Sequence, residues 1–136
     1  MKRVLPPLFM KINKDDPIII LEVLVSGSNG SCRVEMALDT GATFTMIPWD
    51  VAERLGYDPA GSAERVVIMT ASSVEKAPLI VMERVKIFDR EVENIKAVVH
   101  DLPSKSRVDG LLGLSFLKHF DIDLHFKKGC LKFRDG

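Results

Sequence analysis

The chain lacks a net charge and any long apolar run. Its 19 Lys and Arg residues balance 19 Asp and Glu residues, so no general attraction to nucleic acid or to an anionic membrane surface is expected. The aliphatic run Ile18 to Leu21 ends at Glu22, and no apolar run approaches the ~20 residues of a membrane-spanning helix. We therefore expect no nucleic-acid partner, no membrane partner and a cytoplasmic location.

Cysteine is also scarce. Cys32 and Cys130 are the only two cysteines in 136 residues, and a chain of this size needs no disulfide to hold a hydrophobic core together. Without a recognisable secretory signal, we expect both to be free thiols that pack as small apolar side chains.

The composition that remains is typical of one globular domain. Hydrophobic residues make up 46% of the chain and charged residues 28%, which is an ordinary balance for a folded protein. A chain of 136 residues is long enough for one core and too short for two. We expect a single domain over residues 1–136.

Alternation of apolar and polar residues predicts an all-β fold. Cys32, Val34, Met36 and Leu38 fall on one face of a strand, and Asn29-Gly30 just before it is a strong signal for a hairpin turn. The expected strands cover residues 8–12, 18–25, 32–38, 65–70, 79–82, 85–88, 92–99, 122–126 and 130–133, with residues 71–78 as a linker and a polar turn at 89–91.

One helix is expected near the middle of the chain. Pro48 suits the first position of a helix, and Gly56 suits the position just after its end. Val51, Ala52 and Leu55 have helical spacing between them. A short helix is therefore predicted between Pro48 and Gly56.

A single Asp-Thr-Gly triplet, Asp39 to Gly41, stands between two apolar runs. A carboxylate between buried strands is costly unless it is paired or neutralised. The triplet alone is as well explained by a structural turn, in which Asp39 accepts backbone N–H groups and Gly41 relieves the backbone. Its surroundings decide between that turn and a catalytic group.

Two separated segments resemble the retropepsin family of aspartic peptidases, in its cellular branch of bacterial and archaeal members. Asp39-Thr40-Gly41-Ala42 matches the family's catalytic turn, and the later Leu111-Leu112-Gly113 matches the apolar segment that packs beside that turn in a ψ-shaped crossing. The resemblance spans roughly residues 18–126. It implies a closed acid-protease β-barrel, with one short helix after the catalytic turn and another short helical segment after Gly113.

The resemblance implies that Asp39 is the catalytic residue, supported by Thr40, Gly41 and Ala42. Because the chain has one such triplet, the second carboxylate that this chemistry needs must come from another copy of the chain. The expected partners are therefore a second subunit in a homodimer and a peptide or protein substrate. No cofactor and no metal ion is expected.

The substrate-binding residues implied by the resemblance lie in two places. Thr43 and Phe44 follow the turn, where viral relatives commonly carry an acidic pair, so we expect apolar side chains beside the scissile bond. The flap that covers bound peptide would have its tip around Ser72 and Ser73, and Thr70, Ala71, Ser72 and Ser73 are the expected substrate-binding residues there. No glycine occurs between Gly61 and Gly110, so this flap lacks the flexible residue of viral flaps.

Other interpretations remain open. The same fold could serve as a non-catalytic dimeric module that binds peptides or acts as a scaffold, or as a monomer with a silent Asp39. A metal site is a weaker possibility, since the residues in question also fit the solvated face of a strand: His119, Asp121, Asp123 and His125.

Overall fold

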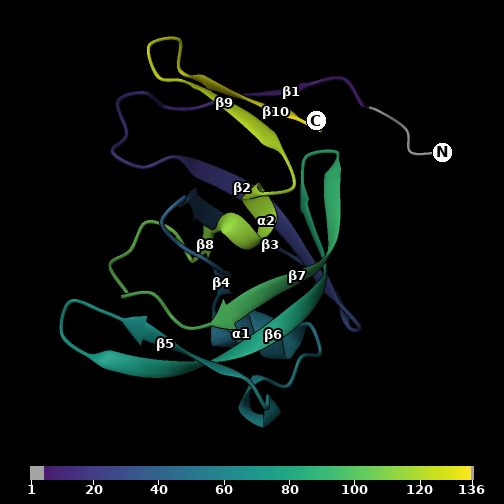
Figure 1. Ribbon diagram of the computed structural model, residues 1–136, viewed down its shortest axis with the longest axis vertical. Helices are drawn as coiled ribbons and strands as arrows, with labels where there is room; N and C mark the ends of the chain where they lie inside the picture. Colours follow the sequence, from purple (N-terminus) through teal and green to yellow (C-terminus); the bar gives the residue numbers. More distant parts are fainter. Residues whose placement is uncertain (1–4, 136) are drawn as a thin grey trace.

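The structure, a computed structural model, describes residues 5–135 and consists mainly of β-strands (Figure 1). Seven strands form the larger sheet in the order β2-β3-β8-β4-β7-β6-β5. Their bounds are β2 (Ile20–Gly27), β3 (Gly30–Leu38), β4 (Thr45–Ile47), β5 (Arg65–Met69), β6 (Val74–Ile87), β7 (Arg90–Val99) and β8 (Gly110–Leu112).

The larger sheet closes into a barrel because β2 also pairs with β6. Leu24, Val25 and Ser26 of β2 lie opposite residues 84–86 of β6, so six strands complete the ring and β5 remains outside it, paired only with β6. Full closure leaves no free edge in the ring. The prediction of an all-β fold with a closed barrel is confirmed.

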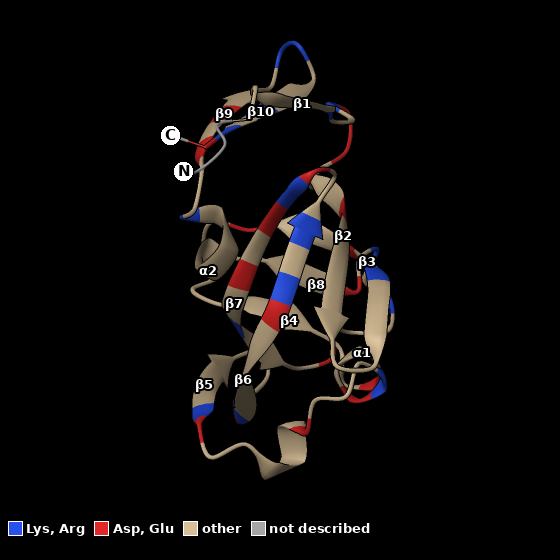
Figure 2. Ribbon diagram, turned by 90° about the vertical axis from the view of Figure 1, so that its right-hand side faces the viewer, with Lys and Arg blue, Asp and Glu red and all other residues tan. Residues whose placement is uncertain are grey.

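A second sheet joins the two ends of the chain. It contains β1 (Leu8–Lys11), β10 (Cys130–Arg134) and β9 (Asp121–His125), in that order, and Figure 2 shows it at the end of the molecule away from the β5–β6 hairpin. Leu8, Leu131 and Phe133 are buried in the same core cluster as the barrel strands. This packing fixes the terminal sheet against the barrel.

Two short α-helices accompany the strands, as predicted. Helix α1 (Trp49–Arg54) follows the candidate catalytic turn, and α2 (Leu114–Leu117) follows Gly113. Pro48 occupies the position before the first helical residue rather than the first itself. A single 3-10 turn, η1 (Pro59–Gly61), follows α1. None of the helices in residues 5–135 has the length and apolarity needed to cross a bilayer.

The expected linker over residues 71–78 is wrong. Strand β6 runs without a break from Val74 to Ile87, and the turn before it is only residues 70–73. Proline usually interrupts a strand because it has no N–H to donate. Pro78 is accommodated because β6 changes partner there: its pairing with β5 ends at Arg65 opposite Pro78, and its pairing with β7 begins at Leu79.

The expected polar turn at residues 89–91 is also misplaced. The turn falls at Phe88 and Asp89, where Phe88 has a φ of 49°, and β7 begins at Arg90. The Arg90 side chain is buried and binds the Pro6 carbonyl oxygen and the carboxylates of Asp89 and Asp135. Arg90 therefore ties both ends of the chain to the barrel, which explains why an arginine is buried here.

Candidate active site

Asp39 begins the turn that follows β3. Its backbone N–H donates to the Leu112 carbonyl oxygen at 3.0 Å, and its own carbonyl oxygen accepts the N–H of Ala42 at 3.3 Å. The N–H of Gly41 donates to Asp39 Oδ1 at 2.9 Å. The carboxylate is therefore held by the turn through one oxygen, which leaves Oδ2 without a hydrogen bond from the described residues and free for chemistry.

The turn is supported from behind by a crossing of strands. Strand β8 lies between β3 and β4, parallel to β3 and antiparallel to β4. Leu111 pairs with Ala37 on one side and with Met46 on the other. The chain therefore enters the turn on one side of β8 and leaves it on the other. The resemblance to retropepsins predicted this packing for Leu111, Leu112 and Gly113.

The turn lies at the surface of the single chain. Asp39 is half-buried, whereas Thr40 and Gly41 are exposed. A carboxylate desolvated between buried strands was expected, and that expectation is wrong for one isolated chain, because β3 ends before the turn, β4 begins after it, and nothing in the described residues covers Thr40. The exposed side of the turn is open to another molecule.

A cleft of about 490 Å³ opens in front of Asp39. Its walls are mostly apolar and come from the strand after the turn, from β5 and from the loop after β7. Of the residues expected from the sequence to form the site, Asp39, Gly41, Ala42, Thr43, Phe44, Thr70 and Leu111 line this cleft. Thr40, Ala71, Ser72, Ser73, Leu112 and Gly113 are not among its lining residues.

The sequence analysis missed several residues that line the cleft. They lie on β4, β5 and β7 or in the loop after β7: Met46, Val66, Ile68, Val98, His100 and Leu102. Val66 and Ile68 alternate with exposed residues on β5, but residues 66–69 are all apolar, so the sequence did not indicate which of them face inward. His100 follows β7 directly, and no pattern in the sequence indicated that this strand ends at the cleft.

Three groups beneath the turn form a buried hydroxyl network that the sequence analysis also missed. Thr45 is completely buried, and its Oγ1 accepts hydrogen bonds from the Gly113 N–H at 3.2 Å and from Ser115 Oγ at 3.0 Å. Ser115 Oγ in turn accepts the Thr45 N–H at 2.9 Å. Since buried polar groups need partners, this network joins β4 firmly to the start of α2.

The β5–β6 hairpin covers one side of the cleft. Its turn is residues 70–73, which include Ser72 and Ser73, and it closes without glycine. Thr70 Oγ1 accepts the Ser73 N–H at 3.0 Å, and the Thr70 N–H donates to the Ser73 carbonyl oxygen at 2.8 Å. A threonine hydroxyl can stabilise a tight turn in this way, so the hairpin turn is ordered by side-chain hydrogen bonds.

A long loop, residues 100–109, forms the opposite side of the cleft. In Figure 1 this loop and the β5–β6 hairpin project on the same side of the barrel. Arg107 donates to Asp16 Oδ1 at 2.6 Å, and this hydrogen bond holds the pKa of Asp16 below its ordinary value. The contact ties the loop to the segment between β1 and β2.

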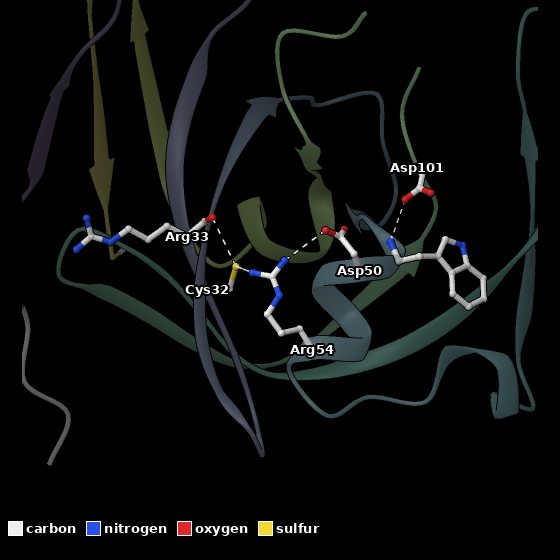
Figure 3. Close-up of polar contacts among 6 residues, drawn as sticks. Cys32, Arg33, Asp50, Arg54 and Asp101 are labelled. Atoms are coloured by element: carbon white, nitrogen blue, oxygen red, sulfur yellow. Dashed lines mark hydrogen bonds and ion pairs between the residues drawn. The ribbon is translucent and has the colours of Figure 1, made fainter. Parts of the chain in front are cut away.

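The start of the same loop is fixed to helix α1. Asp101 Oδ1 accepts the Trp49 N–H at 3.0 Å (Figure 3). Behind the loop lies a second hollow of about 630 Å³, where Arg54 lies between Asp50 and Cys32 (Figure 3). Positive and negative groups are mixed there, so the hollow favours no ligand of one charge. Both cysteines of the chain are free thiols.

Comparison with known proteins agrees with this geometry. A Sinorhizobium sp. protein described as "Uncharacterized protein in cobV 5'region" is 32% identical over 103 residues, which cover 75% of this chain and 42% of that protein. The chain thus spans about two fifths of that relative's length. The crystal structure of a retropepsin-like aspartic protease from Rickettsia conorii superposes with a TM-score of 0.66 and 24% identity, covering 94% of this chain and 90% of that one.

The superposition establishes the fold, and the family follows from the sequence itself. A family model described as aspartyl protease matches residues 22–116. This range contains the Asp39 turn, the β5–β6 hairpin and β8. The chain therefore belongs to the aspartyl protease family and has a retropepsin-like fold.

Proposed function

We propose that the protein is a homodimeric aspartic endopeptidase whose active site contains Asp39 from each of two subunits. The observation that carries this proposal is the position of Asp39: half-buried, at the head of an apolar cleft, in a turn whose outer residues Thr40 and Gly41 are exposed. A two-fold axis through the exposed turn brings two identical carboxylates together.

Two adjacent carboxylates supply the chemistry that one cannot. Because like charges a few ångströms apart resist ionising together, the pair shares one proton. The ionised Asp39 removes a proton from a water molecule, and the protonated Asp39 of the other subunit donates a hydrogen bond to the scissile carbonyl oxygen. Water attacks the carbonyl carbon while the proton of the second carboxyl moves to the carbonyl oxygen. The first Asp39 then passes the proton taken from water to the amide nitrogen, a hydroxyl of the intermediate returns a proton to the other Asp39, and the C–N bond breaks to release a carboxylic acid and an amine. No acyl-enzyme forms.

Peptide binding is assigned to the cleft. A peptide lying in extended form between the hairpin and the turn makes backbone hydrogen bonds, and its alternate side chains enter pockets. Phe44, Met46, Val66 and Ile68 line the cleft in this chain, which supports a preference for apolar side chains beside the scissile bond. Thr43 is exposed, and we assign it a hydrogen bond to the backbone of the substrate.

One carboxylate of the same chain could rival the second Asp39. Asp101 is the other acidic residue that lines the cleft, but its Oδ1 already accepts the Trp49 N–H. Peptide-library cleavage across acid to neutral pH, with products identified by mass spectrometry, separates the two. We expect Asp39→Asn to abolish cleavage and Asp101→Asn, the matched control, to retain it. Cleavage by Asp39→Asn protein would exclude this mechanism.

Mixing the two forms tests whether the site is shared between subunits. With a threefold excess of Asp39→Asn protein, random pairing leaves about a quarter of the wild-type subunits in active dimers. Activity per wild-type subunit should fall about fourfold, whereas a site within one chain would keep its activity unchanged. Light scattering of the wild-type protein should give twice the chain mass.

A non-catalytic peptide-binding module would bind library peptides at every pH and cut none.

A further inference from the structure

The β5–β6 hairpin leaves the sheet as a free ribbon beyond Pro78. Residues 65–69 pair only with residues 74–78, and β6 begins to pair with β7 at Leu79. At the base of the ribbon Arg65 binds the Ala60 carbonyl oxygen. Beyond that base, strand pairing does not connect the hairpin to the rest of the described residues. The position of the hairpin over the cleft therefore depends on side-chain contacts.

His100 lies on the opposite side of the cleft in a fixed position. Its backbone N–H donates to the Ile47 carbonyl oxygen at 3.0 Å, and the next residue, Asp101, binds the start of helix α1. The imidazole lines the same cleft as Asp39 and is about a quarter exposed, with 24% of its side-chain surface accessible. It is thus an ionisable group on a rigid support in a mostly apolar cleft.

Glu75 faces His100 from the hairpin. It pairs across the ribbon with Ile68, and antiparallel partners project on the same side of a sheet, so Glu75 shares the cleft-facing side of Ile68. Its Oε2 lies 3.7 Å from His100 Nε2. Among residues 5–135 this is the one ion pair between the hairpin and the rest of the protein.

We propose that Glu75 and His100 form a latch that holds the β5–β6 hairpin closed over the cleft and that strengthens in acid. Histidine is the side chain that changes charge between about pH 5 and pH 8. When His100 gains its proton, the imidazolium attracts the Glu75 carboxylate across the cleft; when it loses the proton, the attraction ends. At still lower pH, Glu75 becomes protonated and neutral, and the attraction between the two side chains ends again.

Other charged groups lie near the pair. Asp39 and Asp101 line the cleft with His100. On the hairpin, Lys76 follows Glu75 and by strand alternation faces the other side. Arg65 is engaged at the base of the ribbon. His100 is thus a positioning residue that acts through Glu75, and its regulatory role rests on the proposed peptidase function.

Hydrogen–deuterium exchange of residues 66–77 tests the latch without using catalysis. The measurements are made in Asp39→Asn protein, with variants compared at the same pH so that intrinsic exchange rates cancel. Near pH 5.5 we expect Glu75→Gln and His100→Gln each to speed exchange of the hairpin about two- to fivefold, the range for a partly exposed ion pair. Near pH 8 neither should differ from its parent.

His100→Lys is the decisive variant because it keeps a positive charge at both pH values. Near pH 8 its hairpin amides should exchange about two- to fivefold more slowly than those of the parent at the same pH, and adding Glu75→Gln should abolish that protection. His119→Gln, which alters an exposed histidine that does not line the cleft, is the control and should change nothing.

Two results would overturn the latch: equal exchange in parent and Glu75→Gln near pH 5.5, or the same increase at both pH values, which indicates lost packing rather than a lost charge. Neither result bears on peptide cleavage by the wild-type protein. Conversely, absence of cleavage with an intact exchange pattern would overturn the proposed function and leave the latch standing.

Discussion

The backbone N–H of Asp39 donates to the carbonyl oxygen of Leu112 at 3.0 Å. This bond joins the end of β3 to the end of β8, so the candidate catalytic carboxylate is held by the strand crossing as well as by its own turn. Two further bonds continue the connection, from the Leu114 N–H to the Ala42 carbonyl oxygen at 2.8 Å and from the Ser115 N–H to the Thr43 carbonyl oxygen at 3.0 Å. A substitution that shifts β8 relative to β3 and β4 should therefore displace Asp39.

Gly113→Ala should cause such a shift. A Cβ atom at this position would lie 2.5 Å from the Phe44 carbonyl oxygen and 2.7 Å from that of Ala42. Both are backbone atoms, so the strand after the turn would have to move. Overpacking of this kind costs about 1–3 kcal/mol or more, and we expect a lower urea midpoint together with loss of peptide cleavage. An unchanged midpoint and unchanged cleavage would show that the crossing tolerates displacement.

Thr45→Val tests the buried hydroxyl network beneath the turn. Valine has nearly the same shape but leaves the Gly113 N–H and the Ser115 hydroxyl without their acceptor, which should cost about 1–3 kcal/mol in the free energy of unfolding. Thr43→Val is the matched control, because Thr43 is exposed and should change that free energy by less than about 0.5 kcal/mol. Urea unfolding of both variants measures the difference; equal losses would show that the network contributes nothing specific.

Local patterns predicted most of this fold. The strict alternation from Cys32 to Leu38 predicted β3 within two residues of its observed bounds, and the hairpin turn falls at Ser28 and Asn29, one residue before the predicted Asn29-Gly30 pair. The short helix was predicted from Pro48 and Gly56, and it lies where expected. These features depend on residues close together in the chain, for which spacing alone is informative.

The errors concern residues whose neighbours are distant in the chain. Pro78 was taken for part of a linker because the change of strand partner that accommodates it is a tertiary feature. Arg90 was assigned to a polar turn because the partners of its buried side chain, Pro6 and Asp135, lie at opposite ends of the sequence. His100 was missed for the same reason: only the pairing of β4 with β7 brings it to the cleft.

Thr70→Val should loosen the tip of the hairpin without unfolding the protein. The substitution keeps the β-branched shape and removes the hydroxyl that accepts the Ser73 N–H. The turn is exposed, so we expect global stability to change by less than about 0.5 kcal/mol, while amides of residues 70–73 exchange several times faster and KM for peptides rises.

Ser72→Ala is the control for that variant. The Ser72 side chain makes no hydrogen bond within the described part of the chain, and only its backbone N–H reaches Thr70 Oγ1. Its exchange pattern and KM should match those of the wild-type protein. If Thr70→Val behaves like Ser72→Ala, the threonine hydroxyl does not order the hairpin, and another feature must replace the missing glycine.

Arg107→Gln should make stability less sensitive to acid. The hydrogen bond from Arg107 lowers the pKa of Asp16 in the folded protein, so the folded state favours the ionised carboxylate more than the unfolded chain does. The resulting stabilisation is present above the ordinary aspartate pKa of 3.8 and is lost as pH falls through the lower folded value. Without Arg107, the Asp16 pKa should rise toward 3.8. Protonation of Asp16 should then no longer lower the free energy of unfolding in acid.

Carboxyl NMR of Asp16 measures this pKa directly, and urea unfolding at several pH values below about 5 measures the linked stability. Because Arg107 also anchors the loop that forms one side of the cleft, amides of residues 101–109 should exchange faster in Arg107→Gln, and KM for peptides should rise with little change in kcat. Arg33→Gln removes an ion pair elsewhere on the surface, the exposed pair with Glu22, and should leave the Asp16 pKa unchanged. An Asp16 pKa that stays low in Arg107→Gln would assign the shift to the Ile18 N–H, the other hydrogen-bond donor to that carboxylate, and would remove Arg107 as the anchor of the loop.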